Sequence, residues 1–238
     1  MTCFLTSRTD IPVTGGMNPA NGFIEELRRR FSAPCRALFV CSDPGNPEKT
    51  DFYSAMIQKS FEDAGFSFQS FIALDGRNEG RAAELTAVAD LLILSGGHVP
   101  TQNRFFQRIG LKALLEGFEG VIVGISAGSM NSAETVYACP EEEGEALDHA
   151  YERFLPGLGL TKTMILPHWQ FVRDDTLDGL RILEDIVCPD SRGRRFLLLP
   201  DGSWLLCEGG RETVFGEAWL LEDGVQTRIS ADGGSAAL

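Results

Sequence analysis

The sequence predicts an α/β protein built on a mainly parallel sheet, and three observations lead to this prediction. Short apolar runs alternate with amphipathic stretches of helical period, which is the pattern of βαβ units. The apolar runs are continuous, as is typical of strands covered on both faces. The chain has 238 residues, of which 43% are hydrophobic, and it contains no repeat or linker. We therefore expect a single domain over residues 1–238, with a sizeable core.

Five apolar runs are the candidate strands of the parallel sheet: Thr2–Thr6, Ala37–Cys41, Ser67–Ala73, Ala89–Leu94 and Gly120–Gly124. Between the second and third runs, apolar residues recur at helical spacing from Tyr53 to Ala64, and Gly65 then ends the predicted helix. The same spacing predicts an earlier helix through Phe23, Leu27 and Phe31. It also predicts a late helix through Leu177, Leu180, Leu183 and Val187.

The last part of the chain has a different pattern. Leu197–Leu199, the turn Pro200-Asp201-Gly202 and Trp204–Cys207 predict a β-hairpin. Further glycine turns follow it, so we expect an antiparallel extension packed on the main sheet. The predicted architecture is a mainly parallel, flavodoxin-like sheet with helices on both faces and a C-terminal antiparallel extension.

Charge and cysteine content narrow the class of protein. The chain carries 34 acidic and 21 basic residues, a net charge of −13, which disfavours nucleic acids and anionic membranes as partners. Its six cysteines show no Cys-x-x-Cys motif and no dense spacing, so we expect reduced thiols in a cytoplasmic protein. Met1–Leu5 lacks the features of a secretory signal, and no apolar run approaches the roughly 20 residues of a membrane span.

The strongest chemical signal is Gly124-Ile125-Ser126-Ala127-Gly128. It follows an apolar run and precedes a segment of small residues that suits a helix. A Gly-x-Ser-x-Gly turn in this context exposes the serine at the carboxyl edge of the sheet. The amide of Ala127 can then face a developing oxyanion. We predict that Ser126 is a nucleophile; the alternative is a glycine-rich turn with an incidental serine.

A serine nucleophile needs a base, and the chain has only three histidines. His168 ends an apolar run, where a strand would bring it to the same edge as Ser126, and we predict that it is the base. His98 follows Ser95-Gly96-Gly97 at another strand end, and we predict that it lines the substrate pocket. His149 lies in a polar stretch that suits a solvated loop. In the α/β-hydrolase fold the histidine comes late in the chain, after the acid, so the absence of any histidine beyond His168 excludes that fold.

With these residues identified, the chain resembles the dipeptidase E/cyanophycinase family of serine peptidases. The fold of that family is similar to class I glutamine amidotransferases, with serine in place of their cysteine. The matching segments, in order over roughly residues 1–200, are Leu94–Gly97, Gly124–Gly128 and Leu166–Trp169. The resemblance implies that Ser126 is the nucleophile and His168 the base. It also implies that the backbone amides of Gly97 and Ala127 form the oxyanion hole.

The acid that would orient His168 is less well defined. The family pattern points into the acidic run Pro140–Glu145, where Glu141 lies 15 residues after Ser126 and is our choice. Glu142 and Glu143 remain alternatives. A further alternative is that this run is a solvated loop and that the site works as a Ser-His dyad. The segment His98–Asn103 departs from the dipeptidase E pattern, so substrate selection there is expected to differ.

The function predicted from these residues is a serine peptidase or amidohydrolase that cleaves a small peptide or amide. The alternatives are an esterase or acyltransferase with the same residues, and a non-catalytic binding or regulatory protein. Arg104 and Arg173 are candidates for binding an acidic substrate group, but ordinary surface charge is the favoured explanation of both, because most arginines are exposed. No phosphate-binding, dinucleotide or metal-ligand motif is found, so no cofactor and no metal is expected. The sequence leaves a homodimer open.

Overall fold

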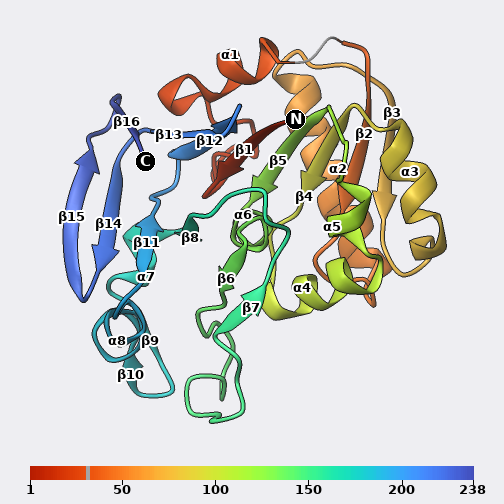
Figure 1. Ribbon diagram of the computed structural model, residues 1–238. Coiled ribbons are helices and arrows are strands. Elements are labelled where there is room, and N and C mark those ends of the chain that lie inside the picture. The colour runs from red at the N-terminus through yellow and green to blue at the C-terminus, as the bar shows by residue number, and fades with distance from the viewer. Residues whose placement is uncertain (31–32) are drawn as a thin grey trace.

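The expected mainly parallel sheet forms the centre of the computed structural model, which describes residues 1–30 and 33–238 (Figure 1). Its parallel strands lie in the order β1-β5-β4-β2-β3. Their bounds are Thr2–Thr6 for β1, Val121–Ile125 for β5, Leu91–Leu94 for β4, Cys35–Val40 for β2 and Phe68–Leu74 for β3. Each of the five predicted runs is confirmed as a strand.

Helices cover both faces of this sheet. The chain moves from β1 through β2 to β3 in one direction and returns through β4 to β5 in the other. Because such crossovers are right-handed, they place α1 and α2 on one face and α3, α4 and α5 on the other. The packing of α3 against α5 agrees with their lying on the same face. Their bounds are Phe23–Arg28 for α1, Pro47–Asp63 for α2, Ala82–Val88 for α3, Val99–Arg108 for α4 and Leu111–Leu114 for α5. All four residues of β4 are buried, as a strand covered on both faces requires.

Helix α2 begins earlier than its apolar spacing indicated. The side chain of Asn46 accepts a hydrogen bond from the backbone amide of Lys49, and Pro47 occupies the first helical position. Both are N-terminal signals, and they extend the helix by more than a turn ahead of Tyr53. The short helix η2 (Glu79–Arg81) precedes α3, and η1 (Ala20–Gly22) precedes α1. Helix α1 confirms the prediction through Phe23 and Leu27, whereas Phe31 lies outside the described residues.

The C-terminal part forms antiparallel strands, as predicted, but it divides between two sheets. One group extends the central sheet beyond β1: β12 (Trp204–Glu208), β13 (Arg211–Phe215) and β16 (Ser235–Ala237). The other forms a second sheet in the order β15-β14-β11-β8, seen beside the central sheet in Figure 1. Its bounds are Val225–Ser230 for β15, Ala218–Glu222 for β14, Arg195–Leu198 for β11 and Met164–Leu166 for β8.

The predicted hairpin around Pro200-Asp201-Gly202 is wrong. Strand β11 pairs with β8 and β14, whereas β12 pairs with β1 and β13. The turn therefore carries the chain from the second sheet to the central one. Turn residues indicate that the chain changes direction, but they do not indicate which strands pair afterwards.

The predicted late helix is also wrong over its first half. Strands β9 (Thr176–Leu177) and β10 (Leu180–Arg181) pair around Asp178 and Gly179, whose φ angles are 55° and 82°. Positive φ at both central residues is the requirement of a tight hairpin turn, and Asp-Gly meets it. The hairpin therefore replaces the first half of the predicted helix. Helical structure begins only with the π-helical segment η3 (Ile182–Val187), which the short helix α8 (Cys188–Asp190) follows.

The second sheet lies between two hydrophobic cores. On β8, Ile165 packs into the core under the central sheet, and its neighbour Leu166 packs into a second core. Alternation of this kind is expected of a strand buried on both faces. The second core also holds residues of α6 (Ala127–Asn131), α7 (Trp169–Val172) and the ribbon of β6 (Thr135–Tyr137) and β7 (Phe154–Pro156). In the described part of the chain, no helix is long and apolar enough to cross a bilayer.

Candidate active site

Ser126 lies on a sharp turn between β5 and α6. Its φ and ψ angles of 49° and −110° are unusual for a residue with a side chain, and its amide donates to the carbonyl of Thr6, 3.0 Å away. Such strain at a strand-to-helix turn is typical of a nucleophile held out at a sheet edge. The turn also needs Gly128, because a Cβ atom there would lie 2.1 Å from the carbonyl oxygen of Leu94.

The structure brings His168 to this serine. His168 follows β8 after one proline, and its Nε2 lies 3.0 Å from Ser126 Oγ. A strand does deliver the histidine, as the sequence indicated, but that strand belongs to the second sheet. The contact is therefore made across the junction of the two sheets.

Asp201, rather than Glu141, lies against the other nitrogen of His168, which corrects the prediction for Glu141. The distance between His168 Nδ1 and Asp201 Oδ1 is 2.7 Å. An ionised carboxylate only accepts hydrogen bonds. Nδ1 of His168 therefore carries a proton and donates a hydrogen bond to Asp201. Nε2 is then the unprotonated nitrogen, and it accepts the hydroxyl hydrogen of Ser126. This is the tautomer that a general base requires.

Asp201 is itself held by further polar groups. The hydroxyl of Ser7 donates a hydrogen bond of 2.7 Å to Asp201 Oδ1. The same hydroxyl accepts a hydrogen bond of 2.8 Å from the backbone amide of His168. The amide of Asp201 donates to the side chain of Gln170. Burial alone would raise the pKa of Asp201, but the hydrogen bonds from His168 and Ser7 outweigh it and lower that pKa below its usual value. The carboxylate is therefore ionised at neutral pH and can stabilise an imidazolium.

Sequence reasoning missed Asp201 and Ser7 because the strand pairing was not known. Asp201 lies just beyond β11, and His168 just beyond β8, and these neighbouring strands are parallel. Parallel neighbours end at the same edge of a sheet, so the pairing of β8 with β11 would have identified Asp201. Ser7 follows β1 in the same way.

The backbone amides proposed for an oxyanion hole lie beside the serine. A Cβ atom on Gly96 would be 3.5 Å from Ser126 Cβ, so the Gly-Gly loop adjoins the nucleophile. Gly97 has a φ of 145°, and a Cβ there would meet the side chain of Ser42 at 2.2 Å, so only glycine fits. Within the described residues, the amides of Gly97 and Ala127 donate no hydrogen bond to the protein. Both are thus available to a ligand.

The remaining sequence candidates lie elsewhere. His98 contacts Thr101 Oγ1 through Nδ1 and Glu145 Oε1 through Nε2, each at 2.8 Å, and it lines neither cavity beside Ser126, contrary to prediction. The ligand atoms of His98, Glu142 and Glu145 come within 4.8 Å of one another, so these residues are a group that could contact a cation, away from the serine. Glu143, like Glu142, is exposed and lines neither cavity.

The two arginines proposed for substrate binding are not at the site either. Arg104 is exposed and donates to Thr101, and Arg173 is exposed and pairs with Asp174. Neither lines a cavity beside Ser126.

Comparison with known families identifies the family of the chain. The family model described as peptidase family S51 matches residues 4–215. The chain belongs to peptidase family S51. As a member of this family it is a hydrolase that acts as a peptidase.

Two solved structures share the fold of this S51 peptidase. One is described as a peptidase from an acI-B1 actinobacterium, with a TM-score of 0.65 and 17% identity, covering 100% of this chain and 96% of the other. The second is described as a putative peptidase E protein from Listeria monocytogenes EGD-e, with a TM-score of 0.60 and 16% identity, covering 96% of this chain and 98% of the other. No curated protein sequence matches the chain.

Two cavities of about 260 Å³ each flank the Ser126–His168 pair of this S51 peptidase. One, which we call the apolar cavity, extends towards α7 and the acidic loop, and Glu141 lines it. The other, which we call the basic cavity, lies over the Gly96-Gly97 loop and α2. Glu141 is exposed, as Glu142 and Glu143 are, but the protein around its carboxyl group desolvates it in part and raises its pKa to about 7. Glu141 is thus a neighbour of the site rather than the partner of His168.

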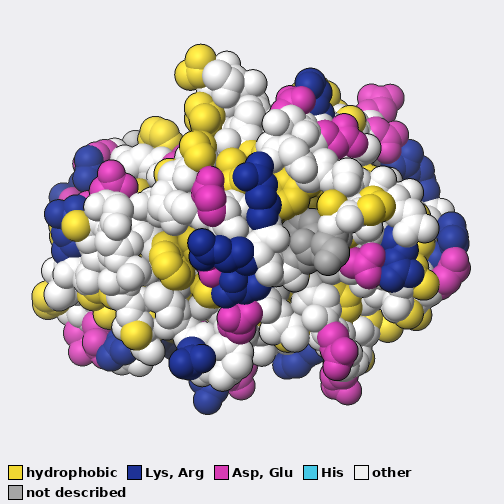
Figure 2. All heavy atoms as spheres, turned by 90° about the horizontal axis from the view of Figure 1, so that it is seen from above, with side chains coloured by type: hydrophobic (Ala, Val, Ile, Leu, Met, Phe, Trp, Pro, Cys, Tyr) yellow, Lys and Arg dark blue, Asp and Glu magenta, His cyan; other side chains and the backbone are white. Residues whose placement is uncertain are grey.

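Two larger cavities, of about 640 and 660 Å³, lie at the opposite edge of the central sheet, but Ser126, His168 and Asp201 line neither of them. Figure 2 views the molecule from above, over α1 and the amino ends of the parallel strands, where basic and acidic side chains intermingle and no histidine is visible. Ser126 and His168 lie at the carboxyl edge, where ligands bind in open α/β sheets.

Proposed function

We propose that this chain is a serine peptidase that hydrolyses short peptides through an acyl-enzyme on Ser126. The observation that carries the proposal is the relay Ser126–His168–Asp201, with contacts of 3.0 and 2.7 Å. Membership of family S51 supports peptide hydrolysis as the reaction. We assign the scaffold to the class I glutamine amidotransferase type in one domain, with a cytoplasmic location supported by six free cysteines in the described chain.

The residues suit the two steps of acyl transfer. Ser126 Oγ attacks the peptide carbonyl while His168 Nε2 takes its proton, and the oxyanion is bound by the amides of Gly97 and Ala127. The C–N bond then breaks, and His168 delivers the proton to the departing amine. Water, activated by the same nitrogen, attacks the ester on Ser126, and the serine is released with its proton restored. Asp201 stabilises the imidazolium in both steps.

The alternative functions predict different behaviour. An esterase or acyltransferase would use the same relay, but the membership of a peptidase family favours peptides over esters. A non-catalytic binding protein would not need a base in the reactive tautomer. The hydrogen bonds that fix this tautomer on His168 therefore favour an active enzyme.

Two assays test the proposed function. The purified chain is treated with a fluorophosphonate probe, which should label Ser126 covalently, and the Ser126→Ala variant should not be labelled. The chain is then incubated with dipeptides and with aryl esters, and the expected result is faster turnover of a dipeptide. Labelling without hydrolysis of any peptide would exclude the peptidase assignment and favour the esterase.

A further inference from the structure

The two cavities beside Ser126 differ in charge. Among the residues that line the apolar cavity in the described structure, the ionisable ones other than His168 and Cys139 are the carboxylates Glu141 and Asp175. The basic cavity is lined by Arg8, Lys49 and a single carboxylate, Asp10. A substrate that spans Ser126 thus meets negative charge on one side and positive charge on the other.

We propose that the apolar cavity binds the N-terminal residue of a short peptide, with Glu141 pairing with its free α-ammonium group, and that Lys49 in the basic cavity pairs with its C-terminal carboxylate. This inference rests on the proposed function and specifies its substrate: a peptide with both ends free and an apolar first residue.

The apolar cavity suits an uncharged side chain. Its wall is formed largely by hydrophobic residues, namely Met130, Leu166, Phe171, Val172, Leu177 and Ile182. No lysine or arginine in the described chain lines it, so an acidic side chain would meet two carboxylates and no compensating cation. An apolar side chain would instead bury hydrophobic surface there. Glu141 lines this cavity together with Ser126, so its carboxyl is the group placed to pair with an ammonium.

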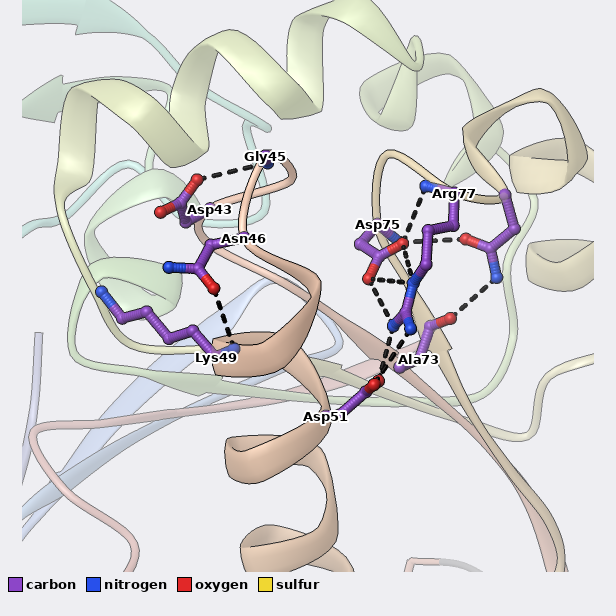
Figure 3. Close-up of polar contacts among 9 residues, drawn as sticks. Asp43, Gly45, Asn46, Lys49, Asp51, Ala73, Asp75 and Arg77 are labelled. Atoms are coloured by element: carbon purple, nitrogen blue, oxygen red, sulfur yellow. Dashed lines mark hydrogen bonds and ion pairs between the residues drawn. The ribbon is translucent and has the colours of Figure 1, made fainter.

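Among the described residues, one cation that lines the basic cavity is free to bind a ligand. Arg8 is paired with Asp10 through two contacts of 3.1 Å. Lys49 makes no side-chain hydrogen bond or ion pair with any described residue, although its backbone amide donates to Asn46. Figure 3 shows its side chain extending away from Arg77, whose guanidinium is already occupied by carboxylates. The ammonium of Lys49 is therefore available for a carboxylate.

A second feature of the basic cavity is a buried polar group without a partner. The hydroxyl of Ser95 is buried, with the residue 5% exposed, and it has no hydrogen-bond partner among the described residues. Buried hydroxyl groups are rarely left without a partner. Ser95 lines the basic cavity beside Gly96, so this hydroxyl is an unpartnered polar group in the wall of the proposed leaving-group site.

The charges also orient the substrate. In a peptide with free ends, the ammonium group lies on the acyl side of the scissile bond and the carboxylate on the leaving side. The carboxylate form of Glu141, which an ammonium partner favours, therefore assigns the acyl side to the apolar cavity, and positive Lys49 assigns the leaving group to the basic cavity.

The test compares Leu-Ala, N-acetyl-Leu-Ala, Leu-Ala amide and Asp-Ala as substrates of the purified full chain, with release of the C-terminal product measured by mass spectrometry. Leu-Ala should have the highest kcat/KM. Acetylation, which removes the ammonium, should lower it about tenfold, as expected for loss of one charge-assisted contact. Amidation should have a similar effect.

Variants then assign each effect to its residue. In Glu141→Gln the ratio of kcat/KM for Leu-Ala to kcat/KM for N-acetyl-Leu-Ala should shrink to about twofold, mainly through a higher KM for Leu-Ala. In Lys49→Met the ratio of kcat/KM for Leu-Ala to kcat/KM for Leu-Ala amide should shrink in the same way. The matched controls are Glu143→Gln, in the same loop but outside the cavity, and Lys59→Met, which is on the same helix but paired with Asp63. Both control variants should keep the parent's kcat/KM ratios for the two substrate pairs.

The failure of this inference is distinguishable from failure of the proposed function. If peptides are cleaved but acetylation has no effect, or if Asp-Ala is preferred and Glu141→Gln does not change this, the inference is overturned and the peptidase assignment stands. If none of the four peptides is cleaved, both are overturned.

Discussion

The two sides of the proposed catalytic relay are built in different ways. The nucleophile side is a steric construction: Ser126 is fixed by a strained backbone and by glycines that allow β4, β5 and α6 to approach closely. The base side is a polar construction, in which hydrogen bonds link His168 and Asp201 to Ser7 across two sheets. Local sequence determines the first side, whereas tertiary pairing determines the second. Enlarging a glycine on the first side should therefore act mainly through stability, whereas removing a reacting or hydrogen-bonding group on either side should act mainly through rate.

The largest expected effect is the loss of the nucleophile. Ser126→Ala should lower kcat by roughly 10⁴-fold or more, because only oxyanion and binding contributions remain. The melting temperature should stay close to that of the parent, since the hydroxyl contacts only His168 among the described residues. Peptide hydrolysis rates and a thermal melt of the same sample check both statements. An active Ser126→Ala enzyme would contradict the assignment.

The steric character of the nucleophile side predicts a large effect of Gly128→Ala on stability. Its new Cβ would lie 2.1 Å from Leu94 O, a backbone atom that cannot move without disturbing β4. The free energy of unfolding should fall by about 3–5 kcal/mol, measured by urea denaturation. Gly80→Ala is the matched control, because nothing lies within 4 Å of its Cβ position, and it should change stability by less than about 1 kcal/mol. Equal stabilities of the two variants would refute the steric account.

The polar character of the base side predicts that Ser7→Ala, unlike Gly128→Ala, affects the rate more than the stability. This change removes one hydrogen bond to Asp201 and one from the amide of His168. We expect kcat to fall about tenfold with little change in KM, since Ser7 positions the base and does not bind the peptide ends. The free energy of unfolding should change by about 1 kcal/mol. A fall in stability comparable with that of Gly128→Ala would mean that Ser7 is chiefly structural.

The smallest expected effect concerns Glu141 and pH. Its folded pKa of about 7 lies above the usual value, mainly because of desolvation, with nearby Glu145 and Glu142 adding to the shift. Between the two pKa values the folded state binds more protons than the unfolded state, so Glu141 makes stability fall as pH rises from about 4.5 to 7. The stability of Glu141→Gln relative to the parent should therefore increase over this range.

Urea denaturation at pH 5, 6, 7 and 8 measures this difference. In Glu143→Gln, the corresponding control, the difference from the parent should stay flat. A flat difference for Glu141→Gln as well would show that its carboxyl is solvated like its neighbour's.

The contrast between the two sides also explains what the sequence could predict. The five parallel strands and the Ser126 turn follow from contiguous residues, because a buried strand and a tight glycine turn are local patterns. His168 was found because the chain has few histidines. Asp201 was misassigned to a hairpin, because its role depends on the pairing of β11 with β8, which no local pattern encodes. Glu141 was chosen from an offset along the chain, and the structure places it in the adjoining cavity instead.

The central claim is that Asp201, and not the acidic loop, orients the base. The most direct test is the rate at which a fluorophosphonate labels Ser126 in Asp201→Asn and in Glu141→Gln, because the probe has no peptide ends for either cavity to bind. An asparagine at position 201 no longer favours the reactive tautomer of His168, so labelling should slow by about 10³–10⁴-fold. Glu141→Gln should label within about threefold of the parent, because the ring nitrogens of His168 are hydrogen-bonded to Asp201 and Ser126 and not to Glu141. Normal labelling of Asp201→Asn, or an equal loss in both variants, would contradict the account.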